Sequence, residues 1–287
     1  MNKFIFLSGL PRSGSTLLSA ILSENSIFHV EGNSPLCQII SDMDDSISYR
    51  CNEQIDANNK RETMINIIKQ IPDMYYHNKQ VNSKIIIDKC RSWTLSENIK
   101  LIENYICKEP KIIILYRNIT EIINSLKNIY CENKKPIDIE RWLDEGSDPL
   151  MLPLKGLIQL KNNNKYLFIN YDDLIIDTEK IIEKIYKYIE EPYFNHDLSN
   201  IKMKNPEKDD IYGLKDFHKV YTFIKKEKRE INLPNKIIKN PNFNYRGSLF
   251  TTPFNLELDI KLEKYELSKL LDINSIFSEL IKNEILF

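Results

Sequence analysis

The sequence predicts an α/β fold in which a parallel β-sheet is flanked by helices on both faces. Short apolar runs rich in Ile recur between residues 4 and 171, and a helix-like segment follows each of them. These runs do not alternate with polar residues, which is typical of strands that are buried on both faces. Strands that alternate with helices form parallel sheets, so the order of elements predicts the fold class.

The first strand, Phe4–Ser8, is followed by a tight turn that holds Gly9 and Gly14, and then by a helix that ends near Asn25. The chain has only seven glycines, and two of them stand in this turn. Because glycine is costly in ordered structure, their position indicates that the backbone closely approaches another group. The turn places free N–H groups and the positive end of a helix dipole at the end of a strand, where a phosphate binds well.

Side chains in the turn also suit a phosphate. Ser13, Ser15 and Thr16 add hydroxyl donors, and Arg12 is the only cation. The usual nucleoside triphosphate loop, GxxxxGK[ST], has a lysine directly before its hydroxyl residue, whereas Gly14 precedes the hydroxyls here. We therefore expect a P-loop-type anion site that is not built for the metal-bridged end of ATP.

Three more pairs of strand and helix complete the predicted sheet. They are Lys84–Lys89 with Ser96–Cys107, Lys111–Arg117 with Thr120–Tyr130, and Tyr166–Tyr171 with a helix that Asp177 caps and that runs to Glu190.

Other segments carry weaker patterns. Phe28–Glu31 reads as a short extended piece, and residues 36–43 and 60–76 show helical spacing. We expect the polar segment Asp44–Asn59 between the two helices to be a mobile loop. Further along, the predicted elements are a loop (Asn195–Asn200), a turn with a short helix (Ile211–Val220), a linker (Pro234–Arg246), an edge strand (Leu256–Leu262) and a helix (Leu267–Phe287).

The chain is predicted to be one domain. Residues 1–200 form the P-loop-type core, and residues 201–287 form an irregular C-terminal extension that packs on it, on the acceptor side. The formal net charge of −1 argues against nucleic acid as a partner. The sequence contains no run of about 20 apolar residues, which is the length that a membrane-spanning helix needs. Five scattered cysteines without metal-ligand spacing indicate a reducing compartment, so we expect a cytoplasmic protein without a metal site.

Ligands of such sheets bind beyond the carboxyl ends of the strands. Three strand ends of this chain supply cations, and a fourth supplies an aromatic ring. The residues are Arg12, Lys89, Arg91, Arg117 and Tyr171. Their convergence on the phosphate loop predicts an anion-binding site.

The loop sequence Leu10-Pro-Arg-Ser-Gly-Ser-Thr-Leu-Leu18 resembles the 5′-phosphosulfate loop of sulfotransferases, which use 3′-phosphoadenosine 5′-phosphosulfate (PAPS). It is more similar to the PRSGTT form of the tyrosylprotein and bacterial branches than to the PKSGTTW form of the cytosolic aryl enzymes. The resemblance covers roughly the first 200 residues. It implies that the donor is bound by Pro11, Arg12, Ser13, Gly14, Ser15 and Thr16.

Two later segments carry the same resemblance. The run from Tyr116 to Ser125, Tyr-Arg-Asn-Ile-Thr-Glu-Ile-Ile-Asn-Ser, is similar to the family's 3′-phosphate motif, which implies that Arg117 and Ser125 hold that phosphate. Asn170-Tyr-Asp-Asp-Leu174 is like the family's YEDL segment, which implies that Tyr171 lies near the adenine.

The resemblance implies in-line transfer of a sulfuryl group to a hydroxyl, with PAP as product and no metal requirement. Lys89 matches a catalytic lysine of the tyrosylprotein branch, and we assign Lys89 and Arg12 to the charge that builds on the leaving phosphate oxygen. Glu31 is expected to be the general base, because the family carries a glutamate shortly after the first helix. His29 and His218 are competing candidates for this role.

The acceptor stays open between a protein tyrosine, a saccharide and a small hydroxylated metabolite. Residues 32–60 and the region from Tyr212 to His218 are the expected acceptor pocket. Two alternative functions remain. One is a P-loop kinase-like phosphotransferase, which would need a loop lysine and magnesium, and the other is a non-catalytic nucleotide- or carbohydrate-binding protein on the same fold.

Overall fold

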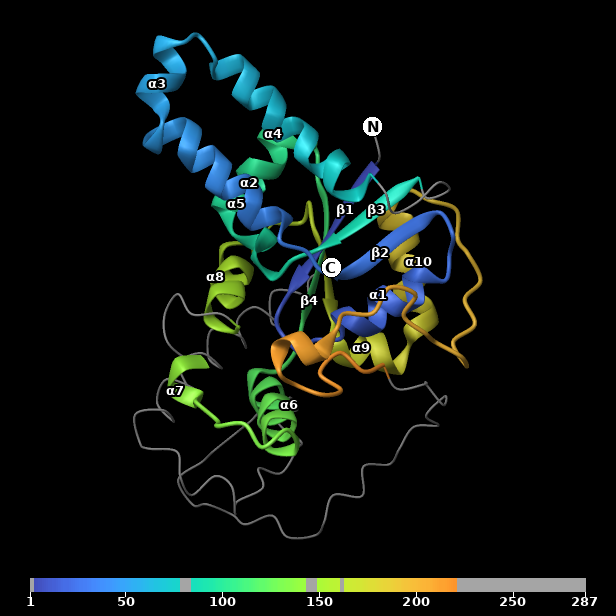
Figure 1. Cartoon of the computed structure of the whole chain (residues 1–287). Helices are drawn as coiled ribbons and strands as arrows, with labels where there is room; N and C mark the ends of the chain where they lie inside the picture. The colour runs from blue at the N-terminus through green and yellow to red at the C-terminus, as the bar shows by residue number, and fades with distance from the viewer. Residues whose placement is uncertain (1–2, 78–83, 143–148, 161–162, 221–287) are drawn as a thin grey trace, which may run out of the picture.

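A computed structural model describes residues 3–77, 84–142, 149–160 and 163–220 (Figure 1). Its strands form one sheet of five parallel strands in the order β2-β3-β1-β4-β5. The strands are β1 (Lys3–Gly9), β2 (Phe28–Asn33), β3 (Ile85–Lys89), β4 (Lys111–Tyr116) and β5 (Leu167–Asn170). The predicted α/β class is confirmed, and the extended piece after the first helix is a fifth strand at the edge of the sheet.

Helices cover both faces of the sheet. One face carries α1 (Ser15–Ser23), α9 (Tyr171–Ile176) and α10 (Thr178–Ile189). The other carries α2 (Leu36–Asp45), α4 (Arg61–Tyr76), α5 (Ser96–Tyr105), α6 (Ile119–Glu132) and α8 (Met151–Leu160). Where the structure describes them, the predicted α-helices exist with bounds within a few residues of those expected, whereas the short helix expected within Ile211–Val220 is a 3₁₀ turn at Asp209–Tyr212. Asp177 stands at the N-cap of α10 as predicted, but its side chain makes no capping hydrogen bond.

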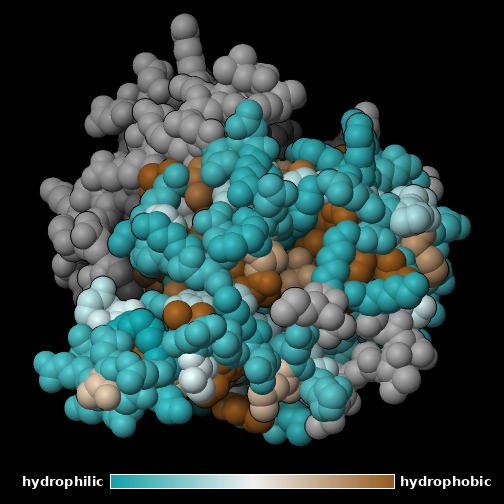
Figure 2. All heavy atoms as spheres, turned by 90° about the horizontal axis from the view of Figure 1, so that it is seen from above, coloured by the Kyte–Doolittle hydropathy of each residue, from teal (hydrophilic) through white to brown (hydrophobic). Residues whose placement is uncertain are grey.

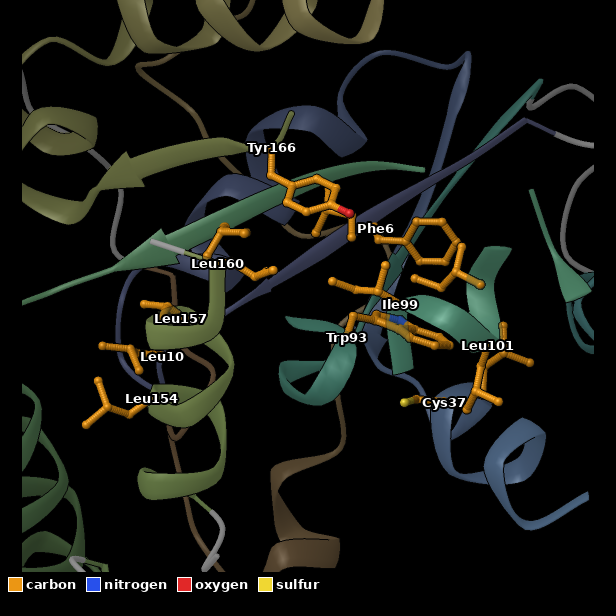
Figure 3. Packing of buried hydrophobic residues seen from close by; sticks show 14 of the residues in the cluster. Phe6, Leu10, Cys37, Trp93, Ile99, Leu101, Leu154, Leu157, Leu160 and Tyr166 are labelled. Carbon is orange, nitrogen blue, oxygen red and sulfur yellow. The ribbon is translucent and has the colours of Figure 1, made fainter. Parts of the chain in front are cut away.

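The first strand, β1, contributes side chains to two separate hydrophobic cores. Phe4 and Phe6 point into the core beneath α2, α5 and α8, whereas Ile5 and Leu7 point into the core beneath α1 and α10. This alternation is the two-residue period of a strand that is buried on both faces. Figure 3 shows the first of these cores, where the rings of Phe6 and Trp93 meet edge to face with centroids 5.3 Å apart.

The prediction of a loop over Asp44–Asn59 is wrong. A single π-helical turn, η1 (Ser46–Arg50), and a short helix, α3 (Asn52–Ala57), occupy this segment. Ile47 and Ile55 are buried in the core cluster, and they anchor a segment that is otherwise polar. Two buried side chains are too few to give a helical period that the sequence alone would reveal. Together α2, α3 and α4 form a helical arm that projects from the sheet (Figure 1).

The remaining short elements are η2 (Arg91–Thr94), α7 (Ile139–Trp142) and η3 (Asp209–Tyr212). The surface seen in Figure 2 is mostly hydrophilic, with apolar areas between the polar side chains. In the described part of the chain, no helix has the length and apolar character that a membrane crossing requires. The predicted linker, edge strand and C-terminal helix, over Pro234–Arg246, Leu256–Leu262 and Leu267–Phe287, lie outside the described residues.

Candidate functional site

The turn between β1 and α1 is shaped by its two glycines. Gly9 has a φ of 129°, and a Cβ atom there would lie 2.0 Å from the carbonyl oxygen of Leu115 in β4. Gly14 has a φ of 89°, and a Cβ atom there would lie 2.8 Å from the ring of Tyr171. No other residue fits at either position, since both the backbone conformation and the space exclude a side chain. The close approach that the sequence indicated is therefore an approach to β4 and to Tyr171.

Arg12 stands at the apex of this turn in the left-handed conformation, with a φ of 58°. A non-glycine residue there is strained, and such strain is concentrated at functional positions. Its Nε donates to the Oγ of Ser125 at 3.1 Å, which joins two segments that are 113 residues apart. The hydroxyl of Ser13 is buried and donates to the carbonyl oxygen of Leu10 at 2.6 Å, so this side chain holds the turn.

A cavity of about 260 Å³ opens over the carboxyl ends of β1, β3 and β4. It brings together most of the residues that the sequence selected. Those that line it are Pro11, Arg12, Gly14, Ser15, Thr16, Lys89, Arg91, Arg117, Ser125 and Tyr171. Ser13 is the one residue of the predicted loop that does not line it, and it serves instead to hold the turn.

The end of the cavity near α6 is built around Arg117. The guanidinium of Arg117 stacks on the ring of Tyr171 at 4.1 Å and donates from Nη1 to the carbonyl oxygen of Arg12 at 3.2 Å. Its Nε donates to Glu121, one turn along α6, at 2.9 Å. Ser125 lies two turns along the same helix and contacts Arg12. This end of the cavity therefore holds two guanidinium groups, a hydroxyl and an aromatic ring in one connected group, formed by Arg12, Arg117, Ser125 and Tyr171.

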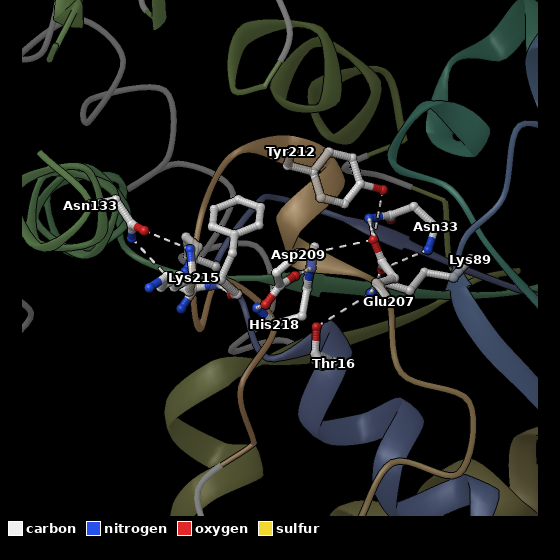
Figure 4. A network of polar contacts seen from close by, with 11 residues as sticks. Thr16, Asn33, Lys89, Asn133, Glu207, Asp209, Tyr212, Lys215 and His218 are labelled. Carbon is white, nitrogen blue, oxygen red and sulfur yellow. Dashed lines mark hydrogen bonds and ion pairs between the residues drawn. The ribbon is translucent and has the colours of Figure 1, made fainter. Parts of the chain in front are cut away.

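The opposite end of the cavity is built around Lys89, the last residue of β3. Its side chain is 5% exposed, and Nζ lies 3.3 Å from the hydroxyl of Thr16 and 3.3 Å from Oε1 of Glu207. Burial lowers the pKa of Lys89, and the charge of Glu207 opposes this shift. Burial would raise the pKa of Glu207, but Lys89 and His218 outweigh it and keep that pKa below its usual range. The pair therefore brings a cation and an anion together at the end of a strand (Figure 4).

His218 also lines the cavity, and Asp209 holds it in place. Nδ1 of His218 lies 2.6 Å from Oδ1 of Asp209, and the backbone N–H of His218 donates to Oδ2 at 2.9 Å. This contact directs Nε2 toward Glu207, whose Oε2 lies 3.6 Å away (Figure 4). Burial lowers the pKa of His218, which favours the neutral imidazole that can accept a proton.

The structure does not bring Glu31 and His29 into the cavity. They bond to each other, with His29 Nε2 2.9 Å from Glu31 Oε1, and the His29 side chain is only 4% exposed. The pairing of β2 with β3 shifts register between Val30 and Asn33. As a result Asn33, rather than Glu31, lines the cavity next to Lys89. Of the three candidates for the general base, only His218 lies in the cavity.

Sequence reasoning missed Glu207 and Asp209. They lie in Pro206-Glu-Lys-Asp-Asp210, a run of charges without a recognisable motif, which resembles an ordinary solvated loop. The contact that identifies Glu207 is tertiary, since its side chain lies over Gly32, where a Cβ atom would come within 1.8 Å of its Cγ. Among the described residues, no group of three or more His, Cys, Asp or Glu side chains is arranged to hold a metal ion.

Comparisons with known proteins give the family and the fold of the chain. Residues 5–195 match the family model described as "Sulfotransferase family". A sulfotransferase domain from the Synechococcus PCC 7002 olefin synthase shares the fold, with a TM-score of 0.52 at 18% identity over 96% of this chain and 95% of that one. A search of curated proteins gives no significant match.

Two further solved structures are more distant. A sulfotransferase domain from the curacin biosynthetic pathway has a TM-score of 0.44 at 15% identity, covering 68% of this chain and 76% of that one. The mouse sulfotransferase SULT7A1, solved in complex with PAP, has a TM-score of 0.42 at 16% identity, covering 68% of this chain and 60% of that one.

Proposed function

The chain belongs to the sulfotransferase family, and from this premise we propose that it transfers the sulfuryl group of PAPS to a hydroxyl group and releases PAP. The observation that carries the proposal is the convergence of cations from three strand ends on one cavity. Arg12 and Arg117 follow β1 and β4, Lys89 is the last residue of β3, and all three line the cavity. A donor with negative charge at two separated positions suits this distribution.

The residues present fit such a donor at both of its charged ends. Near Lys89, the N-terminus of α1 carries the hydroxyls of Ser15 and Thr16 and has no acidic residue in its first turn, which favours a phosphosulfate. Near α6, Arg117 and Ser125 suit a 3′-phosphate. The ring of Tyr171, which already stacks on a guanidinium, offers a face to the adenine.

The donor supplies a sulfuryl group that is activated by its bond to phosphate. Lys89 and Arg12 stabilise the negative charge that develops on the phosphate oxygen as the bond from sulfur to that oxygen breaks. Nε2 of His218 accepts the proton of the acceptor hydroxyl while the new bond between oxygen and sulfur forms. Asp209 orients the ring through Nδ1 and stabilises the imidazolium that results. We therefore assign the general base to His218 rather than to Glu31 or His29.

The acceptor class remains a proposal with three members: a protein tyrosine, a saccharide and a small hydroxylated metabolite. The similarity of the loop to the PRSGTT form supports a place near the tyrosylprotein and bacterial branches. All five cysteines are unpaired, which supports the proposal of a reducing, cytoplasmic compartment.

Calorimetric titration of the full chain with PAP, and in parallel with ATP and magnesium, tests the proposal. We expect PAP to bind without a metal ion and more tightly than ATP with magnesium. A preference for magnesium and ATP would favour the kinase-like alternative, because phosphoryl transfer from ATP needs the metal. If neither nucleotide binds, the proposed function is wrong.

A further inference from the structure

One segment of the chain, residues 205–220, engages both cations that we assign to the leaving group. We call it the covering segment. Its Glu207 pairs with Lys89, and its Phe217 faces Arg12, whose Nη1 donates to the Phe217 carbonyl oxygen at 2.5 Å. The guanidinium of Arg12 also lies 5.4 Å from the centre of the Phe217 ring. Both cations are thus bound by protein groups in this arrangement.

The carboxylate of Glu207 lies between Lys89 and His218. In the proposed reaction, Lys89 faces the leaving oxygen on one side of the sulfuryl group, and His218 faces the acceptor oxygen on the other side. Oε1 lies 3.3 Å from Nζ of Lys89, which faces the leaving oxygen, and Oε2 lies 3.6 Å from Nε2 of His218, which faces the acceptor (Figure 4). In-line transfer requires the sulfuryl group and the acceptor oxygen to lie between these same two atoms. The carboxylate of Glu207 and the sulfuryl group of a bound donor both carry anionic oxygens, and they cannot occupy this position at the same time.

Glu207 is seated in a socket rather than loosely placed. Oε1 accepts from the backbone N–H of Asn33 at 2.8 Å, and Oε2 accepts from the hydroxyl of Tyr212 at 3.0 Å. The absence of a side chain at Gly32 makes room for its methylene groups, and the side chain is only 8% exposed. The cavity of about 260 Å³ is small for a ligand pocket, for which roughly 300–1,000 Å³ is usual. Phe217, His218, Lys219 and Val220 from the covering segment line it.

We propose that Glu207 is an internal anion that occupies the reaction position, and that the 5′-phosphosulfate of the donor displaces it when the covering segment opens. This inference rests on the proposed function. The two anions compete for Lys89, so the closed arrangement penalises donor binding at that end of the cavity. When the donor arrives, Lys89 exchanges one counter-ion for another and stays charged. At the other end of the cavity, the counter-ion of Arg117 is Glu121, which lies outside the covering segment and is not part of this exchange.

The test is the affinity of Glu207→Gln for two nucleotides, measured by calorimetric titration of the full chain. PAP carries a 5′-phosphate that has to reach Lys89, whereas adenosine 3′-phosphate carries only the group for Arg117 and Ser125. We expect the variant to bind PAP about tenfold more tightly than the wild-type chain does, because the negative charge of Glu207 no longer competes with the 5′-phosphate for Lys89. Its affinity for adenosine 3′-phosphate should stay within about twofold.

Two further variants separate displacement from a general effect of charge. Asp210→Asn removes a carboxylate from an exposed position three residues along the same segment, and it should leave PAP affinity unchanged. Gly32→Ala keeps the charge of Glu207 but forces its side chain out of the socket, and it should tighten PAP binding as Glu207→Gln does. Thermal melting of each variant establishes that it is folded.

The outcomes distinguish this inference from the function on which it rests. If PAP binds the wild-type chain and Glu207→Gln equally well, the displacement is wrong while the donor assignment stands. If Glu207→Gln binds PAP less tightly, Glu207 helps to hold the donor and the inference is overturned. If PAP binds none of the variants, both the proposed function and the inference are wrong.

Discussion

The two ends of the cavity each hold a cation paired with a carboxylate, but the pairs are built in opposite ways. Arg117 and Glu121 are four residues apart at the start of α6, and their side chains are 20% and 25% exposed. Lys89 and Glu207 are 118 residues apart, and their side chains are 5% and 8% exposed. The first pair is a local feature of a helix, whereas the second exists only while the covering segment packs on the sheet.

Because of this difference, the two ion pairs differ in the free energy that is needed to break them. A partly exposed pair between residues that are close in sequence contributes at most about 1 kcal/mol, and neither of its members belongs to the covering segment. A buried pair is expensive to break, at about 3–5 kcal/mol, because it leaves an uncompensated charge. Opening of the covering segment is therefore favourable only when another anion takes over Lys89. Under the proposed function, the Arg117 end binds the donor, and the chemistry takes place at the end where the counter-ion is exchanged.

The largest effect is expected at Lys89. Lys89→Met removes the cation that meets the leaving oxygen, and we expect turnover to fall by about a thousandfold or more. PAP should still bind in part, because Arg117 and Ser125 are unchanged. The measurement is the rate of PAP release from PAPS with a hydroxyl compound that the wild-type chain accepts, together with PAP titration. Lys111→Met is the matched control, since Lys111 lies at the amino end of β4 and pairs with exposed Glu190.

Full turnover in Lys89→Met would contradict the leaving-group role. It would also remove the contrast between the two ends of the cavity, because neither would then be specialised for chemistry.

The next effect is expected at His218. We expect His218→Asn to lower turnover by about a hundredfold, because it removes the base but retains a polar side chain of similar size. Burial lowers the pKa of His218 below its ordinary value of 6.5, although Glu207 and Asp209 oppose the shift and Lys89 reinforces it. The base is active when neutral, so the rate should be constant above this lowered pKa and fall as the pH drops through it. A pH profile of turnover should show this fall in the wild-type chain and not in the variant.

Glu31→Gln is the comparison variant for this experiment. Glu31 bonds to His29 and does not line the cavity, so its turnover should stay close to that of the wild-type chain. A loss of turnover in Glu31→Gln, with full activity in His218→Asn, would return the base to Glu31.

Most of the sheet and the cations at both ends of the cavity could be predicted from the sequence. The apolar runs of β1, β3 and β4 are buried on both faces, so each leaves an uninterrupted pattern. The residues that leave those strands have fixed positions, since the carboxyl ends of parallel strands meet at one edge. Arg12, Lys89 and Arg117 could be found by this rule alone.

The rest could not be predicted, because its order is tertiary. Residues 46–57 are helical because Ile47 and Ile55 are buried in the core. Two apolar residues are too few to give a recognisable helical pattern in the sequence. Glu207 and Asp209 lie in a charged run whose role depends on the position of Gly32 and His218. Its place after the first helix favours Glu31 as the base, but the register shift in β2 brings Asn33 to the cavity instead.

The smallest effect on chemistry is expected at Arg117. Arg117→Ala removes the guanidinium that lies against Tyr171, and we expect PAP affinity to fall by about thirtyfold, which is within the range for a hydrogen bond to a charged group. Turnover at saturating PAPS should change by only a few-fold, because Lys89 and His218 remain in place. The measurement is the separation of KM from kcat for PAPS, with Arg61→Ala, on the helical arm, as the control. A fall in kcat as large as that of Lys89→Met would show that the two ends of the cavity act as one catalytic unit. A change confined to KM would assign binding to the Arg117 end and chemistry to the Lys89 end.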